Sequence, residues 1–200
     1  MPISEVTATQ LSDQRSDNPE YINKAQSYLQ NLETLRAHFI QSTPKGRKLS
    51  GVFFLKRPGK LRFEYEGLED FVVADGTFIY FYDSEIKSQS HAPIHQTPAH
   101  FLLRENLKFS GDISVRDSFF DGQNFIVTLF ETKDPGAGTI TLVFDVNDDQ
   151  KSLTLKQWIV KDSQDNLTKV TLSDIEKNID LDPDLFVYRD PESSRPVYNE

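Results

Sequence analysis

The stretch GVFFLKRPGKLRFEYEG, from Gly51 to Gly67, decides the fold, because apolar residues alternate with others on both sides of a turn. Period-two alternation is typical of strands, so we predict two strands over about 49–56 and 61–66. Pro58-Gly59-Lys60 joins them as an antiparallel hairpin. In the second strand the polar residues all fall on one side, which places the apolar side inward. Parity then puts five residues on the interior face: Phe53, Leu55, Leu61, Phe63 and Tyr65.

Arg57 follows the same parity and falls on the side of Phe53 and Leu55. Two interpretations stay open. The side chain could extend into solvent from the strand end, with its stem packed on Leu55. Alternatively, its guanidinium lies among apolar residues and needs oxygen acceptors to offset desolvation. The last carbonyls of a helix would serve, because that end carries partial negative charge. In that case Arg57 could act as a latch that holds a helix over an apolar concavity.

The segments around this hairpin add helices and further strands. Apolar residues at helical spacing predict one amphipathic helix over about 19–40, which includes Phe39. Strands 71–74 and 77–82 flank Asp75-Gly76, and the second of them presents Ile79 and Phe81 on one side. After a polar stretch, Thr97 and Pro98 start a short helix, about 98–106, which presents Phe101 and Leu102.

The C-terminal half reads as five more strands with short turns, followed by LDPDLFVYRDP, which looks like a turn that docks Phe186. We therefore predict nine or ten antiparallel strands and two helices. Residues 1–18 are expected to form a flexible leader, 19–190 a single domain and 191–200 a polar tail. The fold class is mainly β with helices (α+β): an unclosed, strongly curved antiparallel β-barrel with a helical lid over a hydrophobic cavity. Both faces of strands such as 52–55 are apolar, which is more apolar surface than one core requires.

The composition of the chain argues against several classes of function. The chain has 200 residues and a formal net charge of -9, so phosphate backbones are repelled and nucleic acid is a poor partner. Cysteine is absent, which excludes thiol catalysis, thiolate metal sites and acylation of an N-terminal cysteine. No apolar run approaches the roughly 18 residues that a membrane span needs.

Catalytic motifs are also missing. His91 and His95 flank Pro93 in a polar segment, which indicates loop histidines rather than metal ligands. The sequence contains no zinc-protease motif, nucleophile elbow, phosphate-binding glycine loop or dinucleotide fingerprint. We therefore expect a protein that is not an enzyme and has no catalytic residue, metal or cofactor.

At this point the motifs resemble a known family. The resemblance spans about residues 21–188, in an unchanged order, and is to the periplasmic outer-membrane lipoprotein carrier family, LolA. Six segments carry it: YLQNLETLRAHFIQ (28–41), GVFFLKRPGKLRFEY (51–65), FVVADGTFIYFYD (71–83), TPAHFLL (97–103), WIVKDSQDN (158–166) and DLF (184–186).

The resemblance implies a lidded, unclosed barrel and a periplasmic carrier that shields the acyl chains of lipoproteins. Such a carrier accepts them from an inner-membrane ABC transporter complex and hands them to an outer-membrane receptor. The family's latch arginine matches Arg57, and its apolar positions after that motif match Leu61 and Phe63. We expect a monomer whose cavity is lined by ten residues: Phe39, Phe53, Leu55, Leu61, Phe63, Tyr65, Ile79, Phe81, Phe101 and Leu102.

Two departures from the family pattern leave alternatives open. The C-terminal extension of some members is not recognisable in YRDPESSRPVYNE, which leaves the receptor and the direction of transfer undecided. A signal peptide is not visible, and we expect that it has been removed. A general lipid- or glycolipid-binding periplasmic protein on the same fold is the alternative function. An adaptor with exposed apolar patches is a third.

Overall fold

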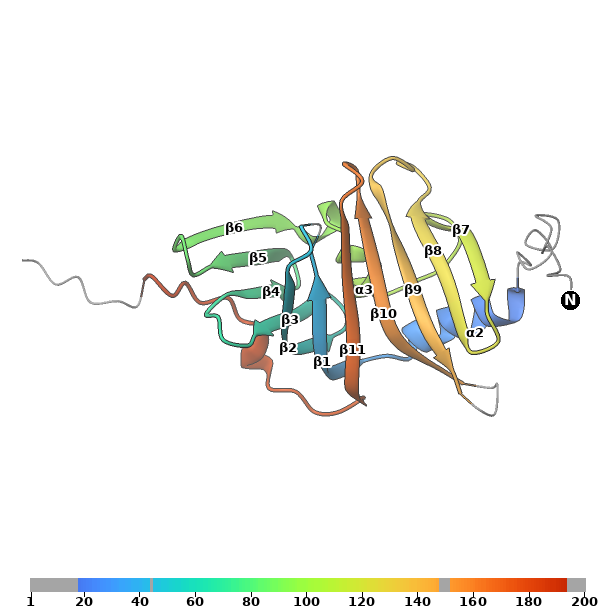
Figure 1. Cartoon of the computed structure of the whole chain (residues 1–200), viewed down its shortest axis with the longest axis horizontal. Coiled ribbons are helices and arrows are strands. Elements are labelled where there is room, and N and C mark those ends of the chain that lie inside the picture. The colour runs from blue at the N-terminus through green and yellow to red at the C-terminus, as the bar shows by residue number, and fades with distance from the viewer. Residues whose placement is uncertain (1–17, 44, 148–151, 194–200) are drawn as a thin grey trace, which may run out of the picture. The chain divides into compact units, whose positions relative to one another are not determined.

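The computed structural model describes residues 18–43, 45–147 and 152–193. They form eleven strands and a few short helices (Figure 1). The strands follow the hydrogen-bonded order β6-β5-β4-β3-β2-β1-β11-β10-β9-β8-β7, which leaves β6 and β7 as the two edges. The predicted fold class, mainly β with an unclosed antiparallel sheet and few helices, is confirmed. The chain divides into two compact units, residues 1–29 with 108–169 and residues 30–107 with 170–200.

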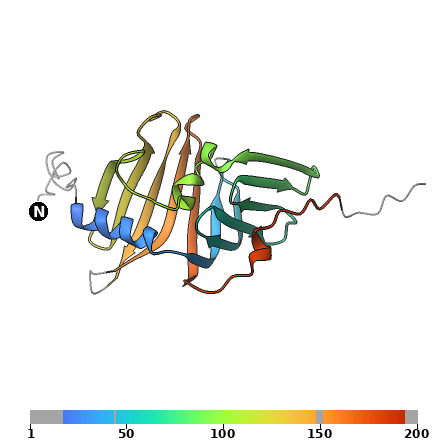
Figure 2. The same cartoon turned by 180° about the vertical axis from the view of Figure 1, so that it is seen from behind.

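The described part of the first unit contains one helix, four strands and the first residues of β11: α2 (Pro19–Gln30), β7 (Ile113–Phe120), β8 (Asn124–Glu131), β9 (Gly138–Val146) and β10 (Leu153–Asp162). β8 and most of β9 alternate buried apolar residues with more exposed ones, and α2 lies across the apolar face of these strands (Figure 2). Tyr21 of α2 stacks on Phe120 and Phe125, at ring distances of 4.7 and 5.5 Å. Tyr28, two turns further along, meets Phe144 edge to face at 5.6 Å.

The second unit contains the remaining elements: β1 (Thr34–Ser42), β2 (Lys48–Lys56), β3 (Lys60–Tyr65), β4 (Phe71–Asp75), β5 (Phe78–Asp83), β6 (Ser88–Pro93), η1 (Ile94–Gln96), α3 (His100–Leu103), η2 (Pro183–Phe186) and most of β11 (Leu167–Lys177). The β2–β3 hairpin forms in the predicted register, with Leu55 opposite Leu61 and Phe53 opposite Phe63. The Asp75-Gly76 turn also forms, and the Asp75 carboxylate accepts hydrogen bonds from the backbone N–H groups of Thr77 and Phe78.

Two strands, β1 and β6, were not predicted. The long helix was predicted to continue to about residue 40, but α2 ends at Gln30. Residues Leu35 and Phe39 lie on β1, where Leu35, Ala37 and Phe39 are buried and the residues between them are more exposed. A separation of four residues fits one helical turn and two strand pleats equally well, so the helical pattern extended into a strand. The polar strand β6 lies at the sheet edge and has no apolar alternation to reveal it.

The short helix is also shorter than the predicted 98–106. α3 spans only His100–Leu103, and Pro98 and Ala99 form a turn before it. The predicted leader lies outside the described residues up to residue 17, as do residues 194–200 of the predicted tail.

Candidate functional site

One face of the second unit gathers eight of the predicted cavity residues. Directly paired residues of an antiparallel sheet point to the same side, so the register fixes this face. One row runs from Leu35 through Leu55, Leu61 and Ala74 to Ile79. The next rows bring in the others. We call this surface the inner face; its predicted members are Phe39, Phe53, Leu55, Leu61, Phe63, Tyr65, Ile79 and Phe81.

Aromatic rings dominate the middle of the inner face. Phe63 lies 4.6 Å from Phe53 and 5.0 Å from Phe39, measured between ring centroids. The Phe39 ring in turn meets Tyr65 edge to face at 5.4 Å. Gly51 makes room for this arrangement, because a Cβ there would lie 2.9 Å from Cε1 of Phe39 and would overlap the carbonyl oxygen of Glu64. The sequence pattern did not single out Gly51, although its position between two aromatic neighbours in the register could have done so.

Cover over the inner face is uneven. Leu55, Leu61 and Ile79, in the row beside the β2–β3 and β4–β5 turns, are 3–4% exposed. Phe81 lies one row further from those turns and is 41% exposed. The structure therefore places Phe81 on the predicted face but leaves much of its ring open.

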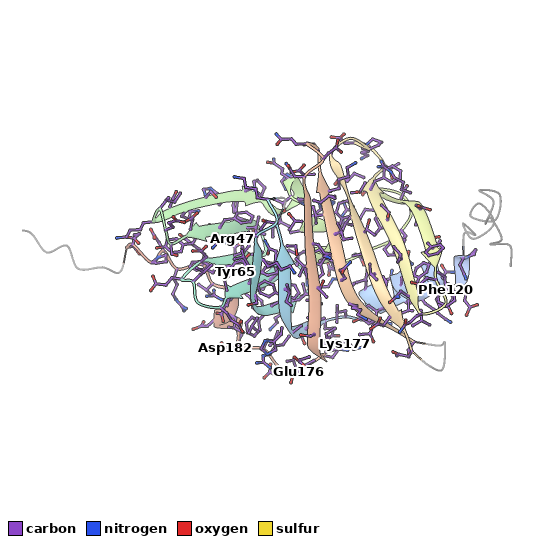
Figure 3. All side chains as sticks on the ribbon, viewed as in Figure 1. Arg47, Tyr65, Phe120, Glu176, Lys177 and Asp182 are labelled. Atoms are coloured by element: carbon purple, nitrogen blue, oxygen red, sulfur yellow. The ribbon has the colours of Figure 1, made fainter. Side chains whose placement is uncertain are left out.

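Tyr65 carries the one hydroxyl among the predicted inner-face residues (Figure 3). It donates a hydrogen bond to Oε1 of Gln41, at 3.1 Å. Burial raises the pKa of Tyr65 to about 12, and the negative charge of Asp70 adds to the rise. The phenol is therefore held neutral on this face.

The raised pKa of Tyr65 predicts a loss of stability at alkaline pH. Below pH 10 the phenol is protonated in both states, and the stabilisation is fully present. Between about pH 10 and pH 12 the unfolded chain ionises first, so the free energy of unfolding should fall by about 2–3 kcal/mol. Chemical unfolding at several pH values would measure this, with Tyr65→Phe as the control that keeps the ring. An equal alkaline fall in both proteins would contradict the assignment to Tyr65.

Arg57 lies in the β2–β3 turn and joins it to α3. Its Nη2 donates a hydrogen bond to the carbonyl oxygen of Arg104, the residue that caps the C-terminal end of α3. A second hydrogen bond reaches the same helix end from the backbone of the turn: the N–H of Gly59 donates to the carbonyl oxygen of Leu103, at 2.9 Å. Both acceptors belong to the carbonyls that a helix end leaves unpaired. Of the two interpretations of Arg57, the structure shows contact with a helix-end carbonyl, that of Arg104.

The environment of Arg57 is costly for a charge. Burial lowers the pKa of its guanidinium below the usual value, and its buried Nε has no hydrogen-bond partner within the described residues. The backbone N–H of Arg57 is bonded to the carbonyl of Glu33, at 2.8 Å, which fixes where the side chain begins. Return of this guanidinium to water would therefore offset part of the hydrogen bond that is lost when the contact breaks.

The two predicted helical residues, Phe101 and Leu102, lie on α3 and are 4% and 6% exposed. All four residues of α3 are buried. So short a helix has little stability of its own, and its position depends on the bonds from the β2–β3 turn and on packing.

The opposite face of β2–β5, here called the outer face, is covered by the C-terminal segment 179–192. Phe54 of β2 packs with Leu181 and Phe186, and the cluster extends to Val52, Ile179 and Leu185. Further along, Tyr188 stacks on Tyr80 with ring centroids 4.3 Å apart, and Tyr82 donates a hydrogen bond to Glu192. This explains why both faces of β2 and β5 are apolar. The docking of Phe186 predicted from the sequence is confirmed.

Comparison with known proteins agrees with this architecture. The family described as "Outer membrane lipoprotein carrier protein LolA" matches residues 30–189. The chain belongs to the LolA family. An outer-membrane lipoprotein carrier protein of Nitrosomonas europaea is 28% identical over 179 residues, which cover 86% of this chain and 82% of the relative. One of Nitrosospira multiformis is 29% identical and covers 85% and 84%.

A solved structure extends the likeness in fold alone. A DUF1329 family protein from Desulfovibrio piger is 8% identical to this chain and has a TM-score of 0.51, covering 84% of this chain and 95% of its own. The LolA relatives are named as carrier proteins, not as enzymes. Within the described ranges, no three His, Asp or Glu residues form a group that could hold a metal ion. No helix among the described residues is long and apolar enough to cross a membrane.

Proposed function

We propose that this LolA-family chain is a periplasmic carrier that shields the acyl chains of lipoproteins on their way from the inner to the outer membrane. Its partners are then acylated lipoproteins, an inner-membrane ABC transporter complex and an outer-membrane lipoprotein receptor. The observation that carries the proposal is the fastening of α3 by Arg57 and Gly59 at the turn end of an aromatic inner face. An apolar face beside a short, breakable helix attachment suits a protein that must take up a greasy ligand and release it.

The free energy needed to release α3 and the free energy gained by burying an acyl chain are of similar size. A hydrogen bond from a charged group contributes about 1.5–3 kcal/mol, and one between neutral groups about 0.5–1.5 kcal/mol. Releasing both attachments of α3 therefore costs roughly 2–4.5 kcal/mol. Each buried methylene contributes about 0.8 kcal/mol, so about three to six methylenes of an acyl chain offset the opening. A long acyl chain binds with a surplus, and a partly inserted one leaves readily.

Mass spectrometry of the protein isolated from its native envelope tests the cargo. We expect intact lipoproteins to remain bound through their acyl chains, since the inner face offers apolar cover and no catalytic group. Recovery of free lipid or glycolipid alone would instead support a general lipid-binding protein on this fold. Recovery of neither from a folded sample would count against both.

The variant Arg57→Leu tests the role of the attachment in the same proposal. This change removes the charged donor to Arg104 together with the cost of burying its charge, so the fold should persist. Release of cargo to the receptor should slow, because the bond that favours the attached position of α3 is lost. Transfer of a lipoprotein from the loaded carrier to membranes bearing the receptor would be followed over time. Arg116→Leu is the matched control, because Arg116 is exposed in the first unit and contacts Pro135 and Phe130 there. Equal transfer by both variants would show that Arg57 is not a latch.

A further inference from the structure

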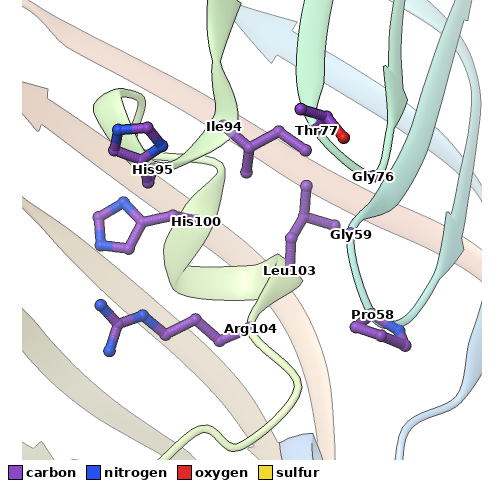
Figure 4. Close-up of a pocket in the computed structure, with 9 residues that line it drawn as sticks. All are labelled: Pro58, Gly59, Gly76, Thr77, Ile94, His95, His100, Leu103 and Arg104. Carbon is purple, nitrogen blue, oxygen red and sulfur yellow. The ribbon is translucent and has the colours of Figure 1, made fainter.

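A pocket of about 380 Å³ opens in the second unit where two hairpin turns meet the segment of η1 and α3 (Figure 4). It is not part of the inner face, because none of the predicted cavity residues lines it. The β2–β3 turn, the β4–β5 turn, η1 and α3 each contribute to its wall: Pro58, Gly59, Gly76, Thr77, Ile94, His95, His100, Leu103 and Arg104. The two turns pack closely, since a Cβ on Gly59 would lie 2.9 Å from Cα of Gly76.

The charge of this pocket opposes that of the whole chain. Arg104 gives the lining one positive charge, His95 and His100 add two imidazole rings, and none of the lining residues is acidic, although the formal net charge of the protein is -9. Figure 4 shows these three side chains extending from the same side of the segment, with Ile94 and Leu103 on the other side. His100 and Arg104 are four residues apart, which places them on one side of a helical turn.

His100 is fixed in this wall. It is 7% exposed, and its Nδ1 lies 2.6 Å from the carbonyl oxygen of Thr97. A carbonyl only accepts, so the Nδ1 nitrogen carries a proton. Arg104 is positioned by its own backbone, because its carbonyl accepts from Arg57 and its N–H donates to the carbonyl of His100, at 3.2 Å. The basic groups therefore sit on a backbone that is held at both ends of α3.

We propose that this pocket binds a phosphate monoester or diester of about the size of glycerol phosphate. The guanidinium of Arg104 donates charge-assisted hydrogen bonds to phosphate oxygens, and no carboxylate in the lining repels them. Sites for small molecules have volumes of about 300–1,000 Å³, so this pocket has room for a phosphate together with a small organic group. The Thr77 hydroxyl provides a neutral donor or acceptor for that group. A soluble phosphate ester and the headgroup of a phospholipid share this chemistry.

The four histidines of the chain make a direct test by proton NMR of their rings. We expect glycerol 3-phosphate to shift the resonances of His95 and His100 saturably and to leave those of His38 and His91 unchanged. Inorganic phosphate should bind at least about tenfold more weakly, because it leaves the rest of the pocket empty. Shifts of all four resonances together, or none, would overturn the proposal. Inorganic phosphate that binds as tightly as the ester would overturn the assignment to an ester.

Two variants and one further ligand complete the experiment. Arg104→Ala keeps the backbone carbonyl that Arg57 uses and should weaken binding about tenfold or more, whereas Arg116→Ala and His91→Ala should not. Unchanged affinity in Arg104→Ala would contradict the proposal. Glycerophosphoglycerol, a deacylated headgroup, separates the two sources: tighter binding than glycerol 3-phosphate supports a lipid headgroup, and weaker binding a soluble ester. None of these ligands has an acyl chain, so the outcome is independent of lipoprotein binding.

Discussion

Gly51→Ala should lower the free energy of unfolding by about 3 kcal/mol, and Gly51→Val by more. Overpacking a well-packed interior typically costs about 1–3 kcal/mol. Here the added Cβ overlaps the carbonyl oxygen of Glu64, which belongs to the β2–β3 ladder, and crowds the ring of Phe39. A flexible side-chain end could give way, but a backbone carbonyl in a sheet cannot. The strands must separate, and the contacts of Phe39 with Phe63 and Tyr65 are lost with them.

Gly136→Ala is the matched control for this prediction. Gly136 lies in the β8–β9 turn without a positive φ, and its nearest neighbour for a Cβ is Oδ1 of Asp134, at an ordinary 3.6 Å. Alanine at a compatible glycine stabilises by about 0.4–1 kcal/mol, because the unfolded chain loses freedom. Urea unfolding of the three proteins should therefore give opposite signs for the two sites. Equal stability of Gly51→Ala and the wild type would contradict the packing at Gly51.

Sequence reasoning succeeded where the alternation and a short turn act together. In 49–66 both strands are contiguous with their turn, so parity alone placed Phe53, Leu55, Leu61 and Phe63 on one face. The same reasoning put Arg57 near that face and suggested helix-end carbonyls as its acceptors. It could not name Arg104, because that residue is 47 positions away and the helix was predicted to continue past it.

The failures have physical causes of their own. Leu35 and Phe39 share a spacing that helices and strands both allow, and Ala37, the residue between them on the same face, is too small to mark a strand strongly. β6 forms by pairing with β5 at the edge, which needs backbone groups and no apolar pattern. The apolar outer side of β2 was visible as Val52 and Phe54, but its cover comes from a segment more than a hundred residues later.

Phe186→Ala, in the segment that covers the outer face, should lower the free energy of unfolding by about 3–5 kcal/mol. Phe186 is 2% exposed and fills the cluster between Phe54 and Leu181. Truncation of a buried phenylalanine removes its transfer free energy and leaves a cavity that the surroundings fill only in part. Val187→Ala is the control, since that neighbour is 45% exposed and should change stability little.

The Phe186 prediction also separates two modes of failure. Leu185 accepts a hydrogen bond from Nη1 of Arg62, at 3.3 Å, and Tyr188 stacks on Tyr80, so the segment is attached on both sides of Phe186. If these attachments hold, the cavity destabilises the whole second unit, and urea unfolding stays a single transition with a lower midpoint. If they do not, limited proteolysis cuts the segment after residue 178 while the strands remain folded. A variant with wild-type stability and no such cleavage would show that Phe186 does not secure the outer face.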